Sequence, residues 1–446
     1  MDDGERSAWI AAEIARVDGI APDAGSHSAK HAKMARNPYC FLRGSAQLIY
    51  GDLASGALHL PQGLTHPALY SAVVGDCHMS NFGFVTEKGS HGRHIIFGPD
   101  DFDDACIGPA AWDLARFVTS LFLSCELAAG IAEGRYTTDE FDDVAGLAPP
   151  EPDEALAGAQ AFVDRYIAIC DEVTIDPAVR RRTLDDFAIG HPLRRFLKKA
   201  RKRAIGGAKF ERKSSLGKAV AIDPAGLRFR DRRRYRRLDE PAEAAVRAAF
   251  RPYVDDAILD VVRRIGQGTG SLDLPRYYLL VGPEGAATSA ELTMCQVVEV
   301  KQQRRAAPLH EFPDLDPRNT LGPAHLTVMI QRRVQREPDL LLDQADWDGE
   351  SWLVRSRHHA RVSAEPEEIC LSDGDAGIRL AHYAQACGEA LALAHSRADN
   401  RSVRFETAMG LALRQDGAAL IEAARSYAER VIADWELYCA MRASGG

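Results

Sequence analysis

The chain has 446 residues, of which 46% are hydrophobic and 27% are charged, and its net charge is −9. This balance is typical of soluble globular proteins, and it excludes a wholly disordered chain, a collagen-like repeat and a small disulfide scaffold. The N-terminus is acidic where an export signal is basic, and no stretch has the composition expected of a membrane span. Nine cysteines without a C-x-x-C pair favour reduced thiols in a cytoplasm.

The predicted elements change in kind along the chain. Residues 1–72 are expected to form helices and loops, and three short strands follow at 71–76, 81–85 and 93–98. An acidic loop then leads into an apolar helix that begins near Pro109, and another helix is expected around 155–170. Further strands are expected at 258–266, 276–282, 294–303, 325–335 and 351–362, and the chain ends in helices.

Two acidic loops carry the residues that suggest chemistry. The first holds Asp76 and Asn81, five residues apart, and the second holds Asp101 and Asp103 directly after another strand. Phosphoryl transfer from ATP needs a carboxylate near the attacking hydroxyl, and oxygen ligands for Mg²⁺. Each residue alone is equally explained as a turn or cap residue, but their joint occurrence in this order is more specific. His78 lies between Asp76 and Asn81 in the sequence, and it is expected either near the hydroxyl that accepts the phosphate or in a structural hydrogen bond.

These loops resemble the catalytic and metal-binding loops of the protein-kinase-like phosphotransferases, particularly the aminoglycoside and choline kinase branch. That branch has H-G-D-x-x-x-x-N, then D-[FW]-x-x-A, then D-L-A. The resemblance implies that Asp76 is the catalytic aspartate, that Asn81 and Asp101 bind Mg²⁺ with Asp103 near a second ion, and that Asp113 supports the catalytic loop. Val74 departs from the pattern, because the branch usually has histidine there.

The stretch Met34–Arg116 is similar to a narrower family, the bacterial domain-of-unknown-function family 2252. The matching pieces are KMARNPYCFLRG, GDCHMSNFG, DFDD and GPAAWDL. QRRVQREPDLLL, WLVRSR and LALAHSRAD match further on, so the resemblance covers most of the chain. The family carries no established reaction.

The nucleotide-binding part of a kinase is expected downstream of these loops. Gly266, Gly268, Gly270 and Ser271 lie between two predicted strands, and Lys301 ends a third. Glycines let backbone N–H groups approach phosphates, and a lysine adds positive charge, so these residues are candidates for binding ATP. The glycine-rich run or Lys301 alone is weak evidence for an ATP site. Glu311 is the candidate acid partner of Lys301, and Glu299 on the same strand face is an alternative.

The order of these pieces predicts an α+β, two-lobed, protein-kinase-like fold that is circularly permuted. In the small-molecule kinases a helix similar to LALAHSRAD runs into the catalytic loop, whereas here it lies near the C-terminus. The expected parts are a catalytic lobe (1–240), a β-rich nucleotide-binding lobe (241–372) and closing helices (373–446). Residues 394–397 are then expected to pack near 74–81, since the termini of permuted chains lie close together.

One segment, 194–237, is strongly basic. It holds 18 lysines and arginines against three acids, so it carries +15 and the other residues together carry −24. A solvated face, docking onto the protein's own acidic surface, an anionic substrate and nucleic acid are all open. The scarcity of interleaved aromatic residues argues against nucleic acid without excluding it.

The sequence therefore favours an ATP- and Mg²⁺-dependent phosphotransferase whose acceptor is a small-molecule or protein hydroxyl. Two alternatives stay open: AMP transfer to a protein by the same fold, and a non-catalytic nucleotide-binding module. No membrane partner is expected, and fold alone does not name the acceptor.

Overall fold

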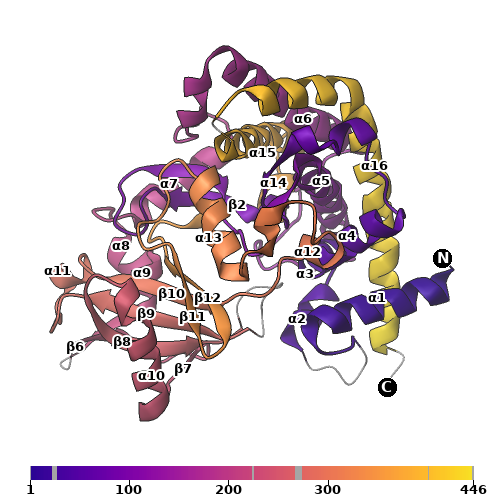
Figure 1. Ribbon diagram of the computed structural model, residues 1–446. Coiled ribbons are helices and arrows are strands. Elements are labelled where there is room, and N and C mark those ends of the chain that lie inside the picture. Colours follow the sequence, from indigo (N-terminus) through magenta and orange to yellow (C-terminus); the bar gives the residue numbers. More distant parts are fainter. Residues whose placement is uncertain (1, 23–27, 224–225, 267–273, 400, 444–446) are drawn as a thin grey trace.

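The computed structural model describes residues 2–22, 28–223, 226–266, 274–399 and 401–443. It is 53% helix and 16% strand with several sheets, which confirms the expected α+β class. Figure 1 shows a large sheet on one side of the molecule and a bundle of long helices on the other.

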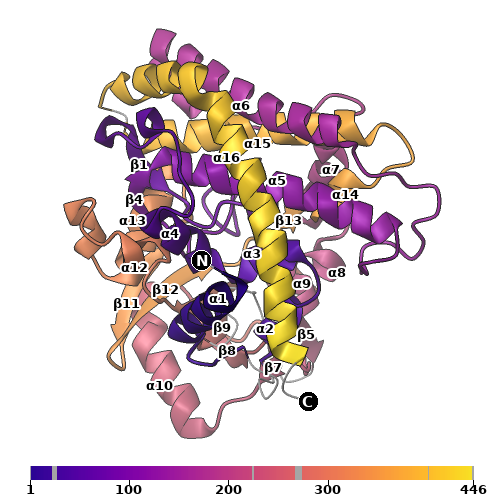
Figure 2. The same ribbon diagram turned by 90° about the vertical axis from the view of Figure 1, so that its right-hand side faces the viewer.

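The two ends of the chain are joined by a buried ion-pair network. The chain opens with the helices α1 (Asp3–Asp18), α2 (Ala29–Met34), α3 (Pro38–Gly44) and α4 (Ala46–Ser55), and it closes with α16 (Arg404–Ala443). Arg6 of α1 lies 2.5 Å from Asp52 of α4 and 2.5 Å from Asp434 of α16, and all three side chains are buried. Figure 2 shows α1 beside the C-terminal part of α16. The N-terminal helices therefore belong to the helical part.

Short strands position the two acidic loops. These strands are β1 (Tyr70–Val73), β2 (Phe82–Thr86), β3 (Ile95–Pro99), β4 (Cys106–Pro109) and β13 (Val362–Ser363). β1 pairs with β4 so that Val73 is opposite Cys106, and β2 pairs with β3 so that Phe82 is opposite Pro99. Loop 74–81 runs from β1 to β2, and loop 100–105 runs from β3 to β4. Both pairings thus hold the ends of one loop against the ends of the other.

Long helices form the main hydrophobic core. They are α5 (Ala110–Ala132), α6 (Pro152–Ile175), α15 (Ala376–Ala398) and α16, with the short α14 (Pro366–Cys370) beside them. Gly388 of α15 lets this helix approach α6 closely, because a Cβ there would lie 2.4 Å from the Phe162 carbonyl oxygen. α5 is long and apolar enough to span a membrane, which the sequence reading missed. However, 83% of its most apolar stretch is buried inside the protein, so α5 is a core helix.

The largest sheet among the described residues is a six-stranded antiparallel one. The strand order is β11-β12-β10-β9-β8-β7, and neighbouring strands are hydrogen-bonded. The strands are β7 (Tyr235–Arg236), β8 (Ala257–Arg264), β9 (Arg276–Gly282), β10 (Gln296–Gln302), β11 (Asp343–Trp347) and β12 (Glu350–Ser356). The helices α10 (Glu240–Phe250), α11 (Ser289–Leu292), α12 (Pro308–Glu311) and α13 (Pro323–Val334) complete this part of the chain.

The strand expected at 325–335 is wrong, because this segment is helix α13. Alternation of Leu326 and Ile330 with polar residues is compatible with a strand. The same two residues, together with Val334, are also spaced four apart, and all three are buried in the main core. Pro323 at the first helical turn decides for the helix.

The basic segment 194–237 contributes to two separate hydrophobic cores. Its first helix, α7 (Leu193–Arg203), buries Phe196 in the main core. The following elements are α8 (Phe210–Lys213), α9 (Ser215–Ala219), β5 (Val220–Asp223) and β6 (Gly226–Phe229). Phe210 and Phe229 share a separate core with Tyr278 of the large sheet. Residues from about 210 onward, which precede the expected boundary at 240, therefore pack with the large sheet.

Candidate active site

Asp113 holds the first acidic loop in place. It lies in the first turn of α5, is fully buried, and accepts hydrogen bonds from the backbone N–H groups of Val74 (2.6 Å) and Gly75 (2.9 Å). Gly75 has a φ of 79°, and a Cβ there would lie 1.9 Å from the Asp104 carbonyl oxygen. Only glycine therefore lets the two acidic loops approach this closely.

The same carboxylate joins the loop to the end of α15. His395 Nε2 lies 3.1 Å from Asp113 Oδ2, and the Tyr166 hydroxyl lies 2.7 Å from His395 Nδ1. The Ser71 hydroxyl also donates to the His395 carbonyl oxygen at 3.1 Å. The expected packing of residues 394–397 near loop 74–81 is therefore present.

Asp76 is paired with a buried arginine that the sequence reading did not select. Arg116 Nε donates to Asp76 Oδ1 at 2.7 Å, and a second guanidinium nitrogen donates to the same oxygen. Arg116 is 1% exposed, whereas the Asp76 side chain is 17% exposed. The spacing carried a signal, because Asp113 and Arg116 are three apart and lie on one face of α5. One face of this helix thus fixes both the backbone and the side chain of the loop.

Two further residues of this loop, His78 and Asn81, lie next to Asp76. His78 Nε2 lies 3.7 Å from Asp76 Oδ2. Burial, together with the positive charges of Arg43 and Arg116, lowers the pKa of His78 well below its usual value, so the imidazole is neutral at pH 7. Asn81 donates its side-chain N–H to the Asp76 carbonyl oxygen at 2.7 Å, which fixes the amide plane.

Lys301 reaches from the large sheet into the second acidic loop. It lies on β10, is 1% exposed, and its ammonium group contacts the Asp103 carboxylate. Burial lowers the pKa of Lys301 to about 7. Burial acts to raise the pKa of Asp101, but the positive charges of Lys301 and Arg355 outweigh it, so the pKa is below its usual value. Asp101 is thus a carboxylate at neutral pH.

The neighbours of Lys301 differ from the expected ones. Glu311, the predicted partner, belongs to the single-turn helix α12 and pairs with Arg16 of α1 at 3.2 Å. Glu299 pairs instead with Arg355 at 2.9 Å. The prediction for Glu311 is therefore wrong, because α12 carries this residue to the N-terminal helices while Lys301 contacts Asp103.

The predicted glycine loop is largely outside the described residues. Gly268, Gly270 and Ser271 all fall there. Gly266 follows β8 with a φ of 67°, in the left-handed region that favours glycine. A phosphate-binding role for this loop stays a prediction.

The two acidic loops carry oxygen donors of the chemical kind that Mg²⁺ takes when it is bound together with phosphates. Among the described residues, no group of three or more His, Cys, Asp or Glu side chains is arranged to hold a metal ion by itself. Mg²⁺ bound with a nucleotide commonly takes one or two carboxylates and completes its shell with phosphates and water. Asp101 supplies one carboxylate, Asn81 an amide oxygen, and Asp103 a second carboxylate that Lys301 contacts.

A known protein family matches most of the chain. The profile of a family described as an uncharacterized protein conserved in bacteria (DUF2252) matches residues 24–135 and 171–441. The chain belongs to this family. The match includes both acidic loops, Arg116, Lys301 and the end of α15. No curated protein and no solved structure matches the chain.

Proposed function

We propose that this DUF2252 chain is an ATP- and Mg²⁺-dependent phosphotransferase with a circularly permuted, protein-kinase-like fold. The observation that carries the proposal is the contact between Lys301 of the large sheet and Asp103 of the second acidic loop. That loop runs beside the loop of Asp76 and Asn81, since the backbone N–H of Asp100 donates to the Asn81 carbonyl oxygen at 3.0 Å. These contacts support a site in which Lys301 would bind phosphate, Asn81 and Asp101 would bind the metal ion, and Asp76 would act as the base.

The position of Lys301 in its sheet supports the proposal. β8, β9 and β10 are consecutive antiparallel strands, and Lys301 lies on the third. In protein kinases the lysine that contacts the nucleotide phosphates also lies on the third strand of its lobe. In kinases the turn between the first two strands covers the phosphates, and here the segment between β8 and β9 lies largely outside the described residues.

In this proposal Asp76 orients the acceptor hydroxyl and takes its proton as the acceptor oxygen attacks the γ-phosphorus; the bond from the γ-phosphorus to the oxygen that bridges it to the β-phosphate breaks, and ADP leaves. Arg116 fixes the rotamer of the Asp76 carboxylate through two hydrogen bonds to Oδ1, while Oδ2 faces the neutral imidazole of His78. Lys301 contacts the phosphates once a nucleotide competes with Asp103. Asn81 and Asp101 would hold Mg²⁺, which when bound neutralises phosphate charge and orients the transferred group.

The permuted order is supported by the contact at Asp113. Helix α15 ends at the loop that carries Asp76, although more than 300 residues separate them in the sequence. If the C-terminus were linked to the N-terminus and the chain were followed from the sheet, the sheet would come first, helix α15 next and the two acidic loops after it. This is the order that a kinase follows.

A cavity next to the loop that carries Asp76 suggests where the acceptor binds. It has a volume of about 310 Å³ and is lined by residues that include Lys33, Tyr39, Arg43 and Glu365. The Tyr39 hydroxyl accepts the backbone N–H of Ser80 at 3.1 Å, so the cavity and the candidate catalytic loop share a wall. Its lining carries both signs of charge, which favours a polar acceptor.

Labelled ATP tests the reaction. With Mg²⁺ and a panel of hydroxyl acceptors, the wild-type chain is expected to transfer label from γ-labelled but not from α-labelled ATP. Asp76→Asn and Asp101→Asn should each abolish transfer, whereas Asp171→Asn, at an exposed ion pair with Arg414, should not. Transfer from α-labelled ATP would replace this reaction with AMP transfer. Nucleotide binding without transfer across the panel would favour a binding module, and no nucleotide binding would refute the proposal.

A further inference from the structure

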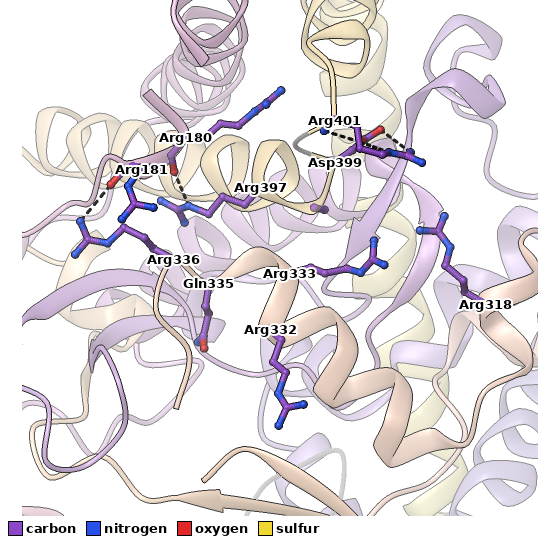
Figure 3. A pocket seen from close by; sticks show the side chains of 11 residues that line it. Arg180, Arg181, Arg318, Arg332, Arg333, Gln335, Arg336, Arg397, Asp399 and Arg401 are labelled. Carbon is purple, nitrogen blue, oxygen red and sulfur yellow. Dashed lines mark hydrogen bonds and ion pairs between the residues drawn. The ribbon is translucent and has the colours of Figure 1, made fainter. Parts of the chain in front are cut away.

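A second cavity is lined almost entirely by arginine. It has a volume of about 800 Å³, and eight arginines surround it. Arg180 and Arg181 lie on η4 (Pro177–Arg181), and Arg318 lies on η6 (Pro317–Thr320). Arg332 and Arg333 lie at the end of α13, and Arg336 lies shortly after it. Arg397 lies on α15, and Arg401 follows that helix. Figure 3 shows these side chains around the opening. No candidate catalytic or metal-binding residue lines it.

Four of these arginines are neutralised by nearby acids. The ion pairs are Arg180–Glu406, Arg318–Asp316, Arg336–Glu87 and Arg401–Asp399. Asp399 lines the cavity itself, whereas the other three acids lie outside the lining and contact their arginines from there. These pairs account for half of the positive charge.

The other four arginines have no ion pair with any described residue: Arg181, Arg332, Arg333 and Arg397. Arg397 donates to the backbone oxygens of Arg180 at 2.7 Å and Arg182 at 2.6 Å, which fixes its guanidinium without neutralising it. Burial and the neighbouring Arg336 lower its pKa to about 10, so it stays charged at neutral pH. Arg332 donates to the Leu342 carbonyl oxygen. Like charges gathered around one cavity repel one another, and a bound anion removes this repulsion.

We propose that this arginine cavity binds a small anion that carries at least two phosphate groups. A phosphate monoester carries a charge of about −1.5 to −2 at pH 7, so two of them balance four guanidinium groups. Guanidinium groups bind phosphate through paired N–H donors. The volume lies within the range of small-molecule sites, roughly 300–1,000 Å³.

The lining also restricts the rest of the ligand. None of the described lining residues is aromatic, so a nucleobase finds no stacking partner. A linear polyphosphate or a phosphorylated sugar or cyclitol satisfies the same charges without stacking. The site is thus distinct from the proposed ATP site. The two are still connected, because Arg397 follows His395 by two residues on α15.

Titration calorimetry on the full chain, in about 0.15 M salt, tests the proposal. The probes are inorganic tripolyphosphate, inositol hexakisphosphate and fructose 1,6-bisphosphate, with sulfate as a single-anion control. Saturable binding of at least one phosphate probe, and much weaker binding of sulfate, is expected. Tripolyphosphate alone would indicate a linear polyphosphate, and binding of the other two a phosphorylated ring compound. No saturable binding of any probe would overturn the proposal.

Matched variants locate the bound anion. Arg181 and Arg333 are exposed and form no ion pair with a described residue, so the double variant Arg181→Gln/Arg333→Gln should fold. It should weaken binding by at least about tenfold. Arg430→Gln is the control, because Arg430 is exposed on α16 about 39 Å along the helix from Arg404. Equal affinity in the double variant, or an equal loss in the control, would contradict the assignment.

Two further measurements keep the test decisive. In the wild-type chain the bound probe should slow hydrogen exchange at 179–182 and 332–336, so the proposal is testable even if the double variant misfolds; no slowing there would contradict it. Asp101→Asn should keep its affinity for the probes, because the cavity does not use the acidic loops. Failure of ATP transfer therefore leaves this inference standing, and failure of anion binding leaves the proposed reaction standing.

Discussion

Replacing Asp113 by asparagine should destabilise the chain and loosen the loop that carries Asp76. The carboxylate accepts two backbone N–H groups and lies 3.1 Å from the His395 ring. Asparagine keeps the shape but turns one oxygen into an N–H donor that faces another donor. A hydrogen bond to a charged group contributes about 1.5–3 kcal/mol, and the bond that survives is roughly halved once the charge is gone. We therefore expect a loss of about 2–5 kcal/mol.

Two readouts separate the local effect from the global one. Urea unfolding followed by circular dichroism should show a lower midpoint, and hydrogen exchange should become faster at the Val74 and Gly75 amides than at core amides of α6. Asp171→Asn makes the same chemical change at an exposed ion pair, where a loss of at most about 1 kcal/mol is expected. An unchanged midpoint together with unchanged exchange at the two amides would refute the role assigned to Asp113.

Three further predictions use other contacts of the structure. Arg116→Leu removes one partner of a largely buried ion pair, so stability should fall by up to about 3–5 kcal/mol in urea unfolding, with a smaller loss in Arg116→Lys; equal stability of all three proteins would contradict this. Lys301 has a pKa of about 7, so it is charged below pH 7 and loses its charge above it. MgATP affinity measured by calorimetry should therefore weaken above pH 7, by at most about tenfold per pH unit, and Lys301→Arg should flatten this dependence; affinity that rises with pH would exclude the role of Lys301. Burial acts to lower the pKa of His94, but hydrogen bonds to Asp185 and Glu87 raise it. Its stabilising effect is full below the unfolded pKa, about 6.5, and is lost as pH rises through the folded value. His94→Gln should reduce the fall in unfolding midpoint between pH 6 and 8. An identical pH profile in this variant would show that the hydrogen bonds of His94 to Asp185 and Glu87 do not contribute to stability.

Much of the fold was accessible from local pattern. β1 to β3, β8 to β10 and the long C-terminal helices form where alternation or helical spacing predicted them, since these segments are bounded by glycine, proline or charged loops, whereas β4 was expected to be part of the second acidic loop. Helix α13 was misassigned because Leu326, Val328 and Ile330 alternate like strand residues, and only the position of Pro323 argues otherwise. Phe210 joins the core of the large sheet, and that could not be predicted because it is a tertiary property.

The candidate site was predictable where its residues lie in motifs and unpredictable where it depends on contacts between distant segments. Asp76, Asn81 and Asp101 are all in short loops whose spacing is visible in the sequence. The pairing of Lys301 with Asp103 joins residues 198 apart and follows from how the sheet lies on the loop. Arg116 was within reach of helical spacing from Asp113, whereas the arginine cavity was not, because its lining comes from four separate segments.

A structure of the chain with a non-hydrolysable ATP analogue and Mg²⁺ tests the central claim most directly. The proposed phosphotransferase predicts that the triphosphate contacts the Lys301 ammonium group, that the metal ion is held by Asn81 and Asp101, and that Asp76 faces the γ-phosphate. A nucleotide bound elsewhere, or a triphosphate that contacts Lys301 while Asp101 stays remote from the metal, would contradict it.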